Sequence, residues 1–328
     1  MTGARPLLLL DTASLYFRAF YGVPEGVGRA PDGTPVNAVR GLLDMMTRLV
    51  VARRPGRLVA CWDADWRPAF RVAALPSYKA HRLAAPPDGA APDGAAPDGA
   101  ASGEEDVPAA LAPQVPIIAE VLDALGVARV GVAGYEADDV IGAYAAREAA
   151  RPAVERSPVE IVTGDRDLFQ LVDDAAEVRV LYTVKGIGQL DVVDQARLAE
   201  RYGVPDGRAY ADMAVLRGDP SDGLPGVPGI GEKTAVALLR RYGDLETLLA
   251  AAEQGDAGLT ATQRRRLLDA RDYLAVAPGV VRVATDLPLP DVPDALPLAP
   301  RDPGVLTALA ERWRLASGLT RLVDALAR

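Results

Sequence analysis

Residues 218–235 read GDPSDGLPGVPGIGEKTA, and this stretch is the most specific pattern in the chain. Its glycines at Gly226, Gly229 and Gly231 predict a tight hairpin whose end opens a helix. Glycines let backbone N–H groups approach a phosphate closely, and a helix N-terminus favours the anion. We therefore expect a hairpin that holds phosphate groups. A purely structural turn between two helices is the alternative.

The helix expected after this hairpin is amphipathic. Its apolar residues share one face: Ala235, Leu238, Leu239 and Tyr242. Lys233, Arg240 and Arg241 fall on the other face, where they are able to follow a phosphate backbone. An ordinary solvated basic face is the alternative to that interpretation.

Working outward, the chain carries nine carboxylates in five short clusters, most of which end an apolar run. They are Asp11, Asp63, Glu136, Asp138, Asp139, Asp165, Asp167, Asp219 and Asp222. Two such charges about 4 Å apart repel by roughly 4 kcal/mol at an effective dielectric of about 20. A pocket of several carboxylates therefore stays partly protonated or holds cations. Each cluster alone also suits a helix cap or a strand end, but together they predict a divalent-metal site for phosphate chemistry.

Short β-rich runs alternate with helical stretches in the first part of the chain. The runs cover residues 5–10, 57–62, 127–132 and 159–163, and the expected helices cover 37–53, 115–125 and 137–150. This alternation indicates a parallel sheet, in which sites gather at the carboxyl ends of the strands. Asp11, Asp63 and Asp165 are expected at that edge.

From about residue 191 we expect helices only. The candidates are 195–202, 208–217, 232–242, 245–253 and 260–276, followed by a Pro-rich stretch at 287–303 and a last helical region at 305–327. The overall prediction is an α/β parallel-sheet core followed by an all-helical domain.

Composition narrows the chemistry. The chain has 328 residues, 49% of them hydrophobic, with one cysteine, Cys61, and one histidine, His81. These counts exclude an internal disulfide and argue against Ser-His-Asp, Cys-His or His-rich zinc sites. Oxygen-only ligand sets suit Mg²⁺ or Mn²⁺. A reducing cytoplasm is the plain interpretation, and no apolar run approaches the roughly 20 residues of a membrane helix.

The net charge of −9 ordinarily counts against a nucleic-acid partner. Acids that bind metal do not act as free negative surface, however, so local basic stripes matter more than the total. One such stripe reads YKAHR at residues 78–82, after Arg67 and Arg71, and on its own is an ordinary solvated face. Residues 87–101 then read PDGAA three times, which predicts a mobile loop over 84–106, with an interdomain linker as the alternative.

Together these motifs resemble the 5′-nuclease superfamily that includes flap endonucleases, and above all the 5′→3′ exonuclease domain of bacterial DNA polymerase I and its free-standing relatives. The resemblance rests on the order and spacing of six elements: Asp11, the CWD at 61–63, the YKAHR at 78–82, residues 134–139, residues 163–167 and residues 218–235. It implies a PIN-like nuclease core with a helical arch, followed by a helix–three-turn–helix domain. It also implies Mg²⁺-dependent hydrolysis of DNA near a 5′ end, at flaps, nicks or frayed duplexes.

The resemblance assigns roles to residues. Asp11, Asp63, Glu136, Asp138 and Asp139 would serve a tighter metal site, and Asp165, Asp167, Asp219 and Asp222 a second one. Lys79 and Arg82 would hold the scissile phosphate, and Arg18 would contact the displaced strand beside Tyr16 or Phe17. The duplex backbone would lie against Gly226, Gly229, Ile230, Gly231, Lys233, Thr234, Arg240 and Arg241. A K⁺ ion would sit on the hairpin carbonyls.

The resemblance also implies a division of the chain. The nuclease core would cover residues 1–190 with an arch insertion at 84–106, the DNA-binding domain 191–290, and the Pro-rich stretch and last helices 291–328. The protein would act as a monomer in primer removal, replication and repair, with polymerase and ligase on separate chains. RNA primer hybrids are compatible substrates.

Two departures from the family pattern are visible. Gly223 stands where the family usually has Asn, which predicts a looser turn at Asp222. The acidic PDGAA insertion replaces a shorter and more basic segment, and we expect its deletion to leave cutting intact or faster. A non-catalytic DNA-junction binder and a PIN-type RNase are the competing functions. The complete set of nine acids argues against the binder, and the helix–three-turn–helix pattern argues against the RNase.

Overall fold

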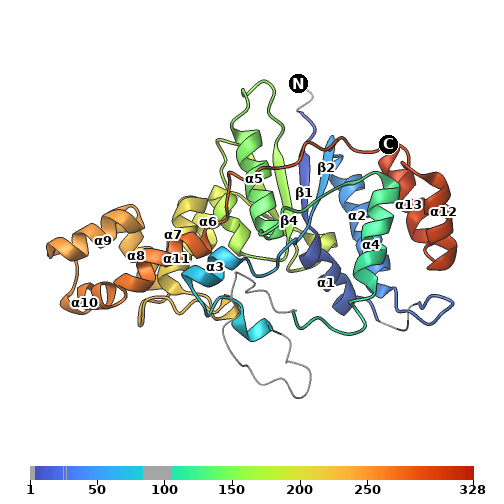
Figure 1. Ribbon diagram of the computed structural model, residues 1–328. Helices are drawn as coiled ribbons and strands as arrows, with labels where there is room; N and C mark the ends of the chain where they lie inside the picture. The colour runs from blue at the N-terminus through green and yellow to red at the C-terminus, as the bar shows by residue number, and fades with distance from the viewer. Residues whose placement is uncertain (1–3, 25, 27, 84–104) are drawn as a thin grey trace, which may run out of the picture.

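The computed structural model describes residues 4–24, 26, 28–83 and 105–328. Within them one sheet has the strand order β3-β2-β1-β4-β5-β6 (Figure 1). Its strands are β1 (Leu7–Asp11), β2 (Arg57–Cys61), β3 (Ala128–Val130), β4 (Val159–Thr163), β5 (Val178–Tyr182) and β6 (Asp191–Val193). All neighbours pair in parallel except β5 and β6, which are antiparallel. The predicted parallel sheet is confirmed, but the expectation of helices alone from residue 191 is wrong at β6.

Strand β1 shows why the centre of this sheet is apolar on both sides. Its side chains alternate between two cores: Leu7 and Leu9 pack in one, and Leu8 and Leu10 in the other. All four are almost completely buried. A run of leucines without polar alternation is the pattern expected of a central parallel strand covered on both faces.

Helices cover the two faces of the sheet. Helices α2 (Asn37–Arg53) and α4 (Gln114–Leu125) pack on the face of Leu8, and α5 (Ala137–Ala149) packs on the face of Leu7. All three were predicted to within one residue at each end. The last helices, α12 (Pro303–Arg312) and α13 (Ala316–Leu326), lie against α4 and α2, so the end of the chain completes the core.

The strand order creates a switch point. From β1 the chain proceeds through β2 to β3 on one side, and β4 then pairs with the other side of β1. In such sheets the carboxyl ends of the two strands that flank the switch point border a crevice. Asp11, the last residue of β1, lies there and caps α1 (Thr12–Gly22) by accepting from the Ser14 backbone N–H at 3.1 Å.

The second part is helical, as predicted, and its outer end lies opposite α12 and α13 (Figure 1). It comprises α6 (Gln195–Tyr202), α7 (Gly207–Arg217), α8 (Glu232–Tyr242), α9 (Leu245–Gln254), α10 (Ala261–Asp269) and α11 (Arg271–Val281). The single helix expected over 260–276 is wrong, because the chain breaks at Ala270 into α10 and α11. The two segments then pack on different neighbours, α9 and α7.

Between β2 and α4 lie α3 (Ala69–Ala74) and the short 3-10 helix η2 (Ala80–Arg82). Most of the expected arch insertion at 84–106 falls on residues 84–104, outside the described residues. On either side of that segment, Leu83 pairs with Glu105 in an isolated β-bridge. Among the residues that the structure describes, no helix is both long and apolar enough to cross a membrane.

Candidate metal and nucleic-acid site

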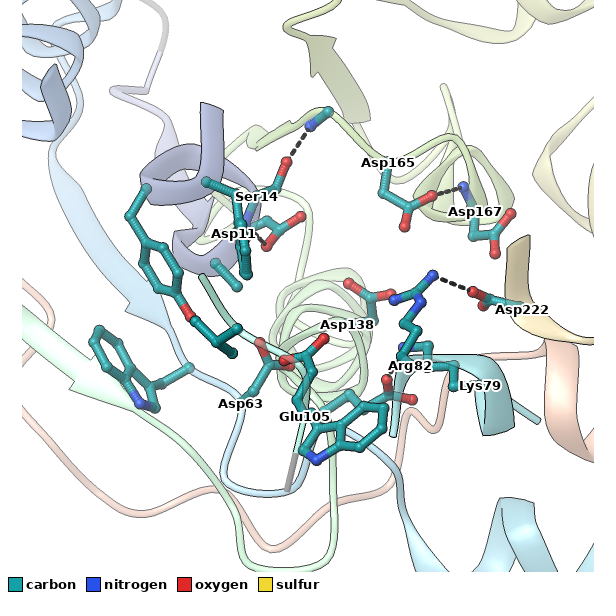
Figure 2. A pocket seen from close by; sticks show the side chains of 18 of the residues that line it. Asp11, Ser14, Asp63, Lys79, Arg82, Glu105, Asp138, Asp165, Asp167 and Asp222 are labelled. Atoms are coloured by element: carbon teal, nitrogen blue, oxygen red, sulfur yellow. Dashed lines mark hydrogen bonds and ion pairs between the residues drawn. The ribbon is translucent and has the colours of Figure 1, made fainter. Parts of the chain in front are cut away.

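Acids from all five sequence clusters meet in one cleft of about 1070 Å³. Eight of the predicted carboxylates line it: Asp11, Asp63, Glu136, Asp138, Asp165, Asp167, Asp219 and Asp222. Lys79 and Arg82 line the same cleft (Figure 2). The tertiary structure thus brings together eight of the nine predicted acids and both predicted phosphate-binding cations.

Strand ends and helix starts position these acids. Thr163, the last residue of β4, donates its hydroxyl to Asp11 Oδ2 at 2.6 Å, so it fixes one acid across the switch point. Asp63, two residues beyond β2, accepts from the Ala137 backbone N–H at 2.8 Å. Glu136 is the N-cap of α5, and Asp138 lies in its first turn. The start of α5 therefore joins two clusters that are far apart in sequence.

The second group of acids comes from two turns. Asp165 follows β4 and accepts from the Asp167 backbone N–H at 2.8 Å. Asp219 caps the 3-10 helix η5 (Pro220–Asp222), whose last residue is Asp222. The η5 turn is tied to η2, because the Lys79 backbone N–H donates to the Asp222 carbonyl at 3.0 Å.

The positive charges of Lys79 and Arg82 do not outweigh the burial of these acids. Burial, together with the charges of Asp63 and Asp165, raises the pKa of Asp11 to about 7, although the Thr163 hydroxyl opposes the shift. Burial and then the charge of Asp11 raise the pKa of Asp138 well above its usual range. Burial likewise raises the pKa values of the other cleft acids Asp63, Asp167 and Asp222. A bound cation is what such a cluster needs to ionise fully.

The side chains as they stand do not form a finished coordination shell. Within the described part of the chain, no three His, Cys, Asp or Glu side chains are close enough to hold one ion together. Oxygen ligands set around an open cleft nevertheless fit a hard cation that keeps several of its waters. An ion at this place would therefore require rotation of carboxylates or bridging water molecules.

The two cationic side chains are paired with acids of the cleft. Lys79 Nζ donates to Glu136 Oε1. Arg82 donates to Asp222 Oδ1 at 2.7 Å, the contact drawn in Figure 2. Burial works to lower the pKa of Lys79, but Glu136, Tyr78 and Asp222 together outweigh it and raise that pKa well above the usual value. Lys79 is therefore charged at neutral pH.

Asp139 is placed differently from the other eight acids. It is fully buried and does not line the cleft. Arg71 donates to both of its oxygens, at 2.6 and 2.8 Å. Sequence reasoning could not separate Asp139 from its neighbour Asp138, because only the rotation of α5 decides which of the two faces the cleft.

Of the residues expected to meet the displaced strand, Tyr16 and Phe17 line the cleft and Arg18 does not. The structure adds two carboxylates that the sequence did not indicate, Asp65 and Glu105. Glu105 lines the cleft and, because of burial, has a raised pKa. Its position follows only from the bridge to Leu83, so no local sequence signal could have identified it.

The glycine hairpin has the predicted form. It connects α7 to α8, whose N-cap is Gly231. Ile230 is buried and anchors the turn, while Gly229, Lys233, Arg240 and Arg241 are exposed and Thr234 is half-buried. The Gly229 carbonyl accepts from Arg266 Nη1 at 2.9 Å, and Arg240 Nε donates to the Gly203 carbonyl at 3.0 Å.

Comparisons with known proteins agree with this geometry. The family model described as "5'-3' exonuclease, N-terminal resolvase-like domain" matches residues 6–203, and "5'-3' exonuclease, C-terminal SAM fold" matches residues 206–304. The chain belongs to the 5′-3′ exonuclease family. It is therefore a nuclease of the hydrolase class, as the sequence predicted.

Two similar proteins are each described as a 5′-3′ exonuclease. The one from Streptomyces coelicolor is 63% identical over 323 residues, which cover 97% of this chain and 99% of that protein. The one from Mycobacterium tuberculosis is 49% identical over 328 residues, which cover 98% of each. DNA polymerase I of Mycobacterium bovis is 36% identical over 99% of this chain, which spans only 32% of the polymerase.

Solved structures support the fold. T5 5′-exonuclease with bound zinc has a TM-score of 0.61 at 18% identity, over 98% of this chain and 97% of that one. The catalytic core of Rad2 in complex with a DNA substrate has a TM-score of 0.54 at 12% identity, over 98% and 93% of the two chains. The predicted fold class, a PIN-like core joined to an all-helical domain, is confirmed.

Proposed function

We propose that this exonuclease hydrolyses DNA phosphodiesters at 5′ flaps, nicks and frayed duplex ends with the help of two divalent cations. Mg²⁺ is the expected ion, and Mn²⁺ is expected to replace it. The observation that carries the proposal is the cleft that eight of the predicted carboxylates share with Lys79 and Arg82. A protein that only binds junctions has no reason to keep so many mutually repelling acids.

The acids divide by their position into two groups. Asp11, Asp63, Glu136 and Asp138 come from the ends of β1 and β2 and the start of α5, and would hold the tighter ion. Asp165, Asp167, Asp219 and Asp222 come from the two turns and would serve the second ion, directly or through water. When bound, such ions activate a water molecule and stabilise the leaving oxygen.

Lys79 and Arg82 hold and neutralise the scissile phosphate in this proposal. Both are paired with cleft acids, Glu136 and Asp222. Cations held by those acids would leave Lys79 and Arg82 free to contact the phosphate, where negative charge grows in the transition state. The acids thus serve both as ligands and as resting partners of the cations.

The DNA would be held on both sides of the cleft. Tyr16 and Phe17 offer ring faces to an unpaired base, with Arg18 nearby. The hairpin and the basic residues of α8 would hold the duplex backbone. Because backbone contacts carry no base code, the structure of the DNA and not its sequence selects the cut site, and RNA primer hybrids are compatible. A K⁺ ion on the hairpin carbonyls would have to displace Arg266 from Gly229.

We further propose the setting in which this activity is used. The protein acts as a monomer in the cytoplasm, in primer removal and repair, together with a DNA polymerase and a ligase. The related segment of DNA polymerase I performs its role within a longer chain, which supports a place in the same process.

Cleavage of a 5′-labelled flap duplex tests the function. We expect cutting near the flap junction with Mg²⁺, none with EDTA, and a loss of at least about 100-fold in the Asp165→Asn variant, since a ligand carboxylate is lost. Asp165 is exposed, and asparagine keeps the oxygen that accepts from the Asp167 N–H, so this variant should fold normally.

The matched control is Asp123→Asn. Asp123 is an exposed acid of α4 that pairs with Arg129, at 3.1 Å, away from the cleft. It should cut like the wild type. Tight flap binding without cutting in Mg²⁺ or Mn²⁺ would contradict the nuclease proposal and favour the junction binder.

A further inference from the structure

Arg71 is a buried cation that lies directly behind the cleft. It belongs to α3 and is only 2% exposed. Its guanidinium donates to Glu136 Oε2 at 2.5 Å and to both oxygens of Asp139, and its Nε donates to the Val280 carbonyl at 3.0 Å. A buried arginine with three different partners is held in one orientation, because each bond restricts the planar fork.

Asp139 has no acceptor position to spare. Its Oδ1 accepts from Arg71 Nη2 and from the Ala284 backbone N–H at 2.8 Å. Its Oδ2 accepts from Arg71 Nη1 and from the Glu136 backbone N–H at 3.2 Å. An ionised carboxyl group offers about four lone-pair sites, and these four bonds use them. A direct bond to an ion would require the carboxylate to give up protein partners in a fully buried place.

Glu136 is divided between the same network and the cleft. Its Oε2 accepts from Arg71 and from the Tyr78 hydroxyl at 2.7 Å. Its Oε1 accepts from Lys79, a residue of the cleft. The Arg71 side of the carboxylate is therefore fixed by two donors, and the other oxygen is the one left to exchange between Lys79 and a cation.

We propose that Arg71 and Asp139 form a positioning pair that orients Glu136 and the start of α5, and that Asp139 is not itself an ion ligand. This inference rests on the metal-dependent function proposed above. The pair also joins the cleft to the end of the helical domain, since Val280 lies in α11 and Ala284 follows it. The pair thereby fixes the start of α5 against the end of α11 and the residues that follow it.

Equilibrium Mn²⁺ binding to the free protein, measured by the electron paramagnetic resonance of unbound Mn²⁺, tests the pair without relying on turnover. Arg71→Lys keeps the charge but loses the two-pronged contact, and Asp139→Asn keeps one acceptor oxygen. We expect each variant to weaken the tighter Mn²⁺ site about tenfold. Because the two residues act as one unit, the double variant should bind no more weakly than either single variant.

Arg57→Lys is the matched control. Arg57 makes a two-pronged contact with Asp294, at 2.9 and 2.6 Å, at the start of β2, the end of the strand away from the cleft. It should lower the urea midpoint, as Arg71→Lys does, yet leave Mn²⁺ binding unchanged. Circular dichroism confirms that each variant is folded before binding is measured.

Two outcomes would overturn the inference while leaving the metal site in place. One is wild-type Mn²⁺ binding in folded Arg71→Lys. The other is a double variant whose losses multiply, as they would if Asp139 ligated the ion independently. A wild-type protein that binds no Mn²⁺ would instead overturn the proposed metal site, and this inference with it.

Discussion

At the residue scale, Gly223 shows how a departure from the family pattern is decided by its neighbours. Its φ of 72° is in the left-handed region, and a Cβ there would lie 2.0 Å from the Ser77 carbonyl oxygen. The Ser77 hydroxyl also donates to the Gly223 carbonyl at 2.8 Å. The sequence alone predicted a looser turn, but the backbone of residue 77 fills the place where a side chain would be.

We therefore expect Gly223→Ala to separate η5 from η2 and to slow flap cutting at least about tenfold, because the overlap with backbone cannot be relieved by a side-chain rotation. Single-turnover cutting rates measure the effect. Gly188→Ala is the control, since a Cβ at exposed Gly188 meets nothing within 4 Å. An alanine variant at Gly223 that cuts at the wild-type rate would show that this contact does not position Asp222.

At the element scale, α8 explains how an acidic protein can bind DNA. The chain has a net charge of −9, yet its cleft concentrates acids where cations are expected. The other face of α8 carries exposed Lys233, Arg240 and Arg241, while Ala235, Leu238 and Leu239 are buried. Lys233 lies at the start of α8, and Arg240 and Arg241 lie in its last turn. Such a local basic face is a suitable partner for a phosphate backbone, whatever the total charge of the protein.

Lys233→Gln should weaken duplex binding several-fold and reduce the slope of log affinity against log salt by about 1, since one phosphate contact is lost. The dissociation constant of a labelled duplex, measured by fluorescence anisotropy at salt concentrations between about 50 and 200 mM, gives this slope. Arg321→Gln is the control, because Arg321 lies on α13 at the opposite end of the molecule (Figure 1). An unchanged salt slope in the Lys233 variant would exclude this residue from the interface.

At the scale of the whole molecule, the cleft acids oppose folding until cations bind. The fold raises the pKa of Asp11 to about 7 from the ordinary value of 3.8, which applies to the unfolded chain. Between these two pH values the folded state therefore binds more protons than the unfolded state. In the metal-free protein, the contribution of Asp11 to the unfolding free energy is therefore greatest below about pH 4 and decreases as the pH rises to about 7.

The Asp11→Asn variant lacks this titration. In EDTA, the wild type should therefore lose unfolding free energy relative to the variant by at most about 1.4 kcal/mol per pH unit between pH 5 and 7. Mg²⁺ at pH 8 should raise the unfolding free energy of the wild type. The increase should be about 2.7 kcal/mol when the free Mg²⁺ concentration is a hundred times its dissociation constant. Urea unfolding at each pH, with EDTA or Mg²⁺, provides the comparison. A constant difference between the two proteins across this range would refute a raised pKa at Asp11.

Local periodicity, turn residues and strand ends are enough to predict strands β1 to β4, most of the helical second part, the hairpin and the five acid clusters. They do not predict β5 or β6, which complete the sheet. Only the tertiary structure decided which acids face the cleft. Asp138 and Asp139 are adjacent in sequence, and the rotation of α5 sends one to the cleft and the other to Arg71. Glu105 and the contact of Gly223 with Ser77 likewise arise from segments that meet only in the folded chain. A local sequence pattern predicts the secondary structure of its own segment. Side-chain burial and pairing depend instead on which other segments pack against it.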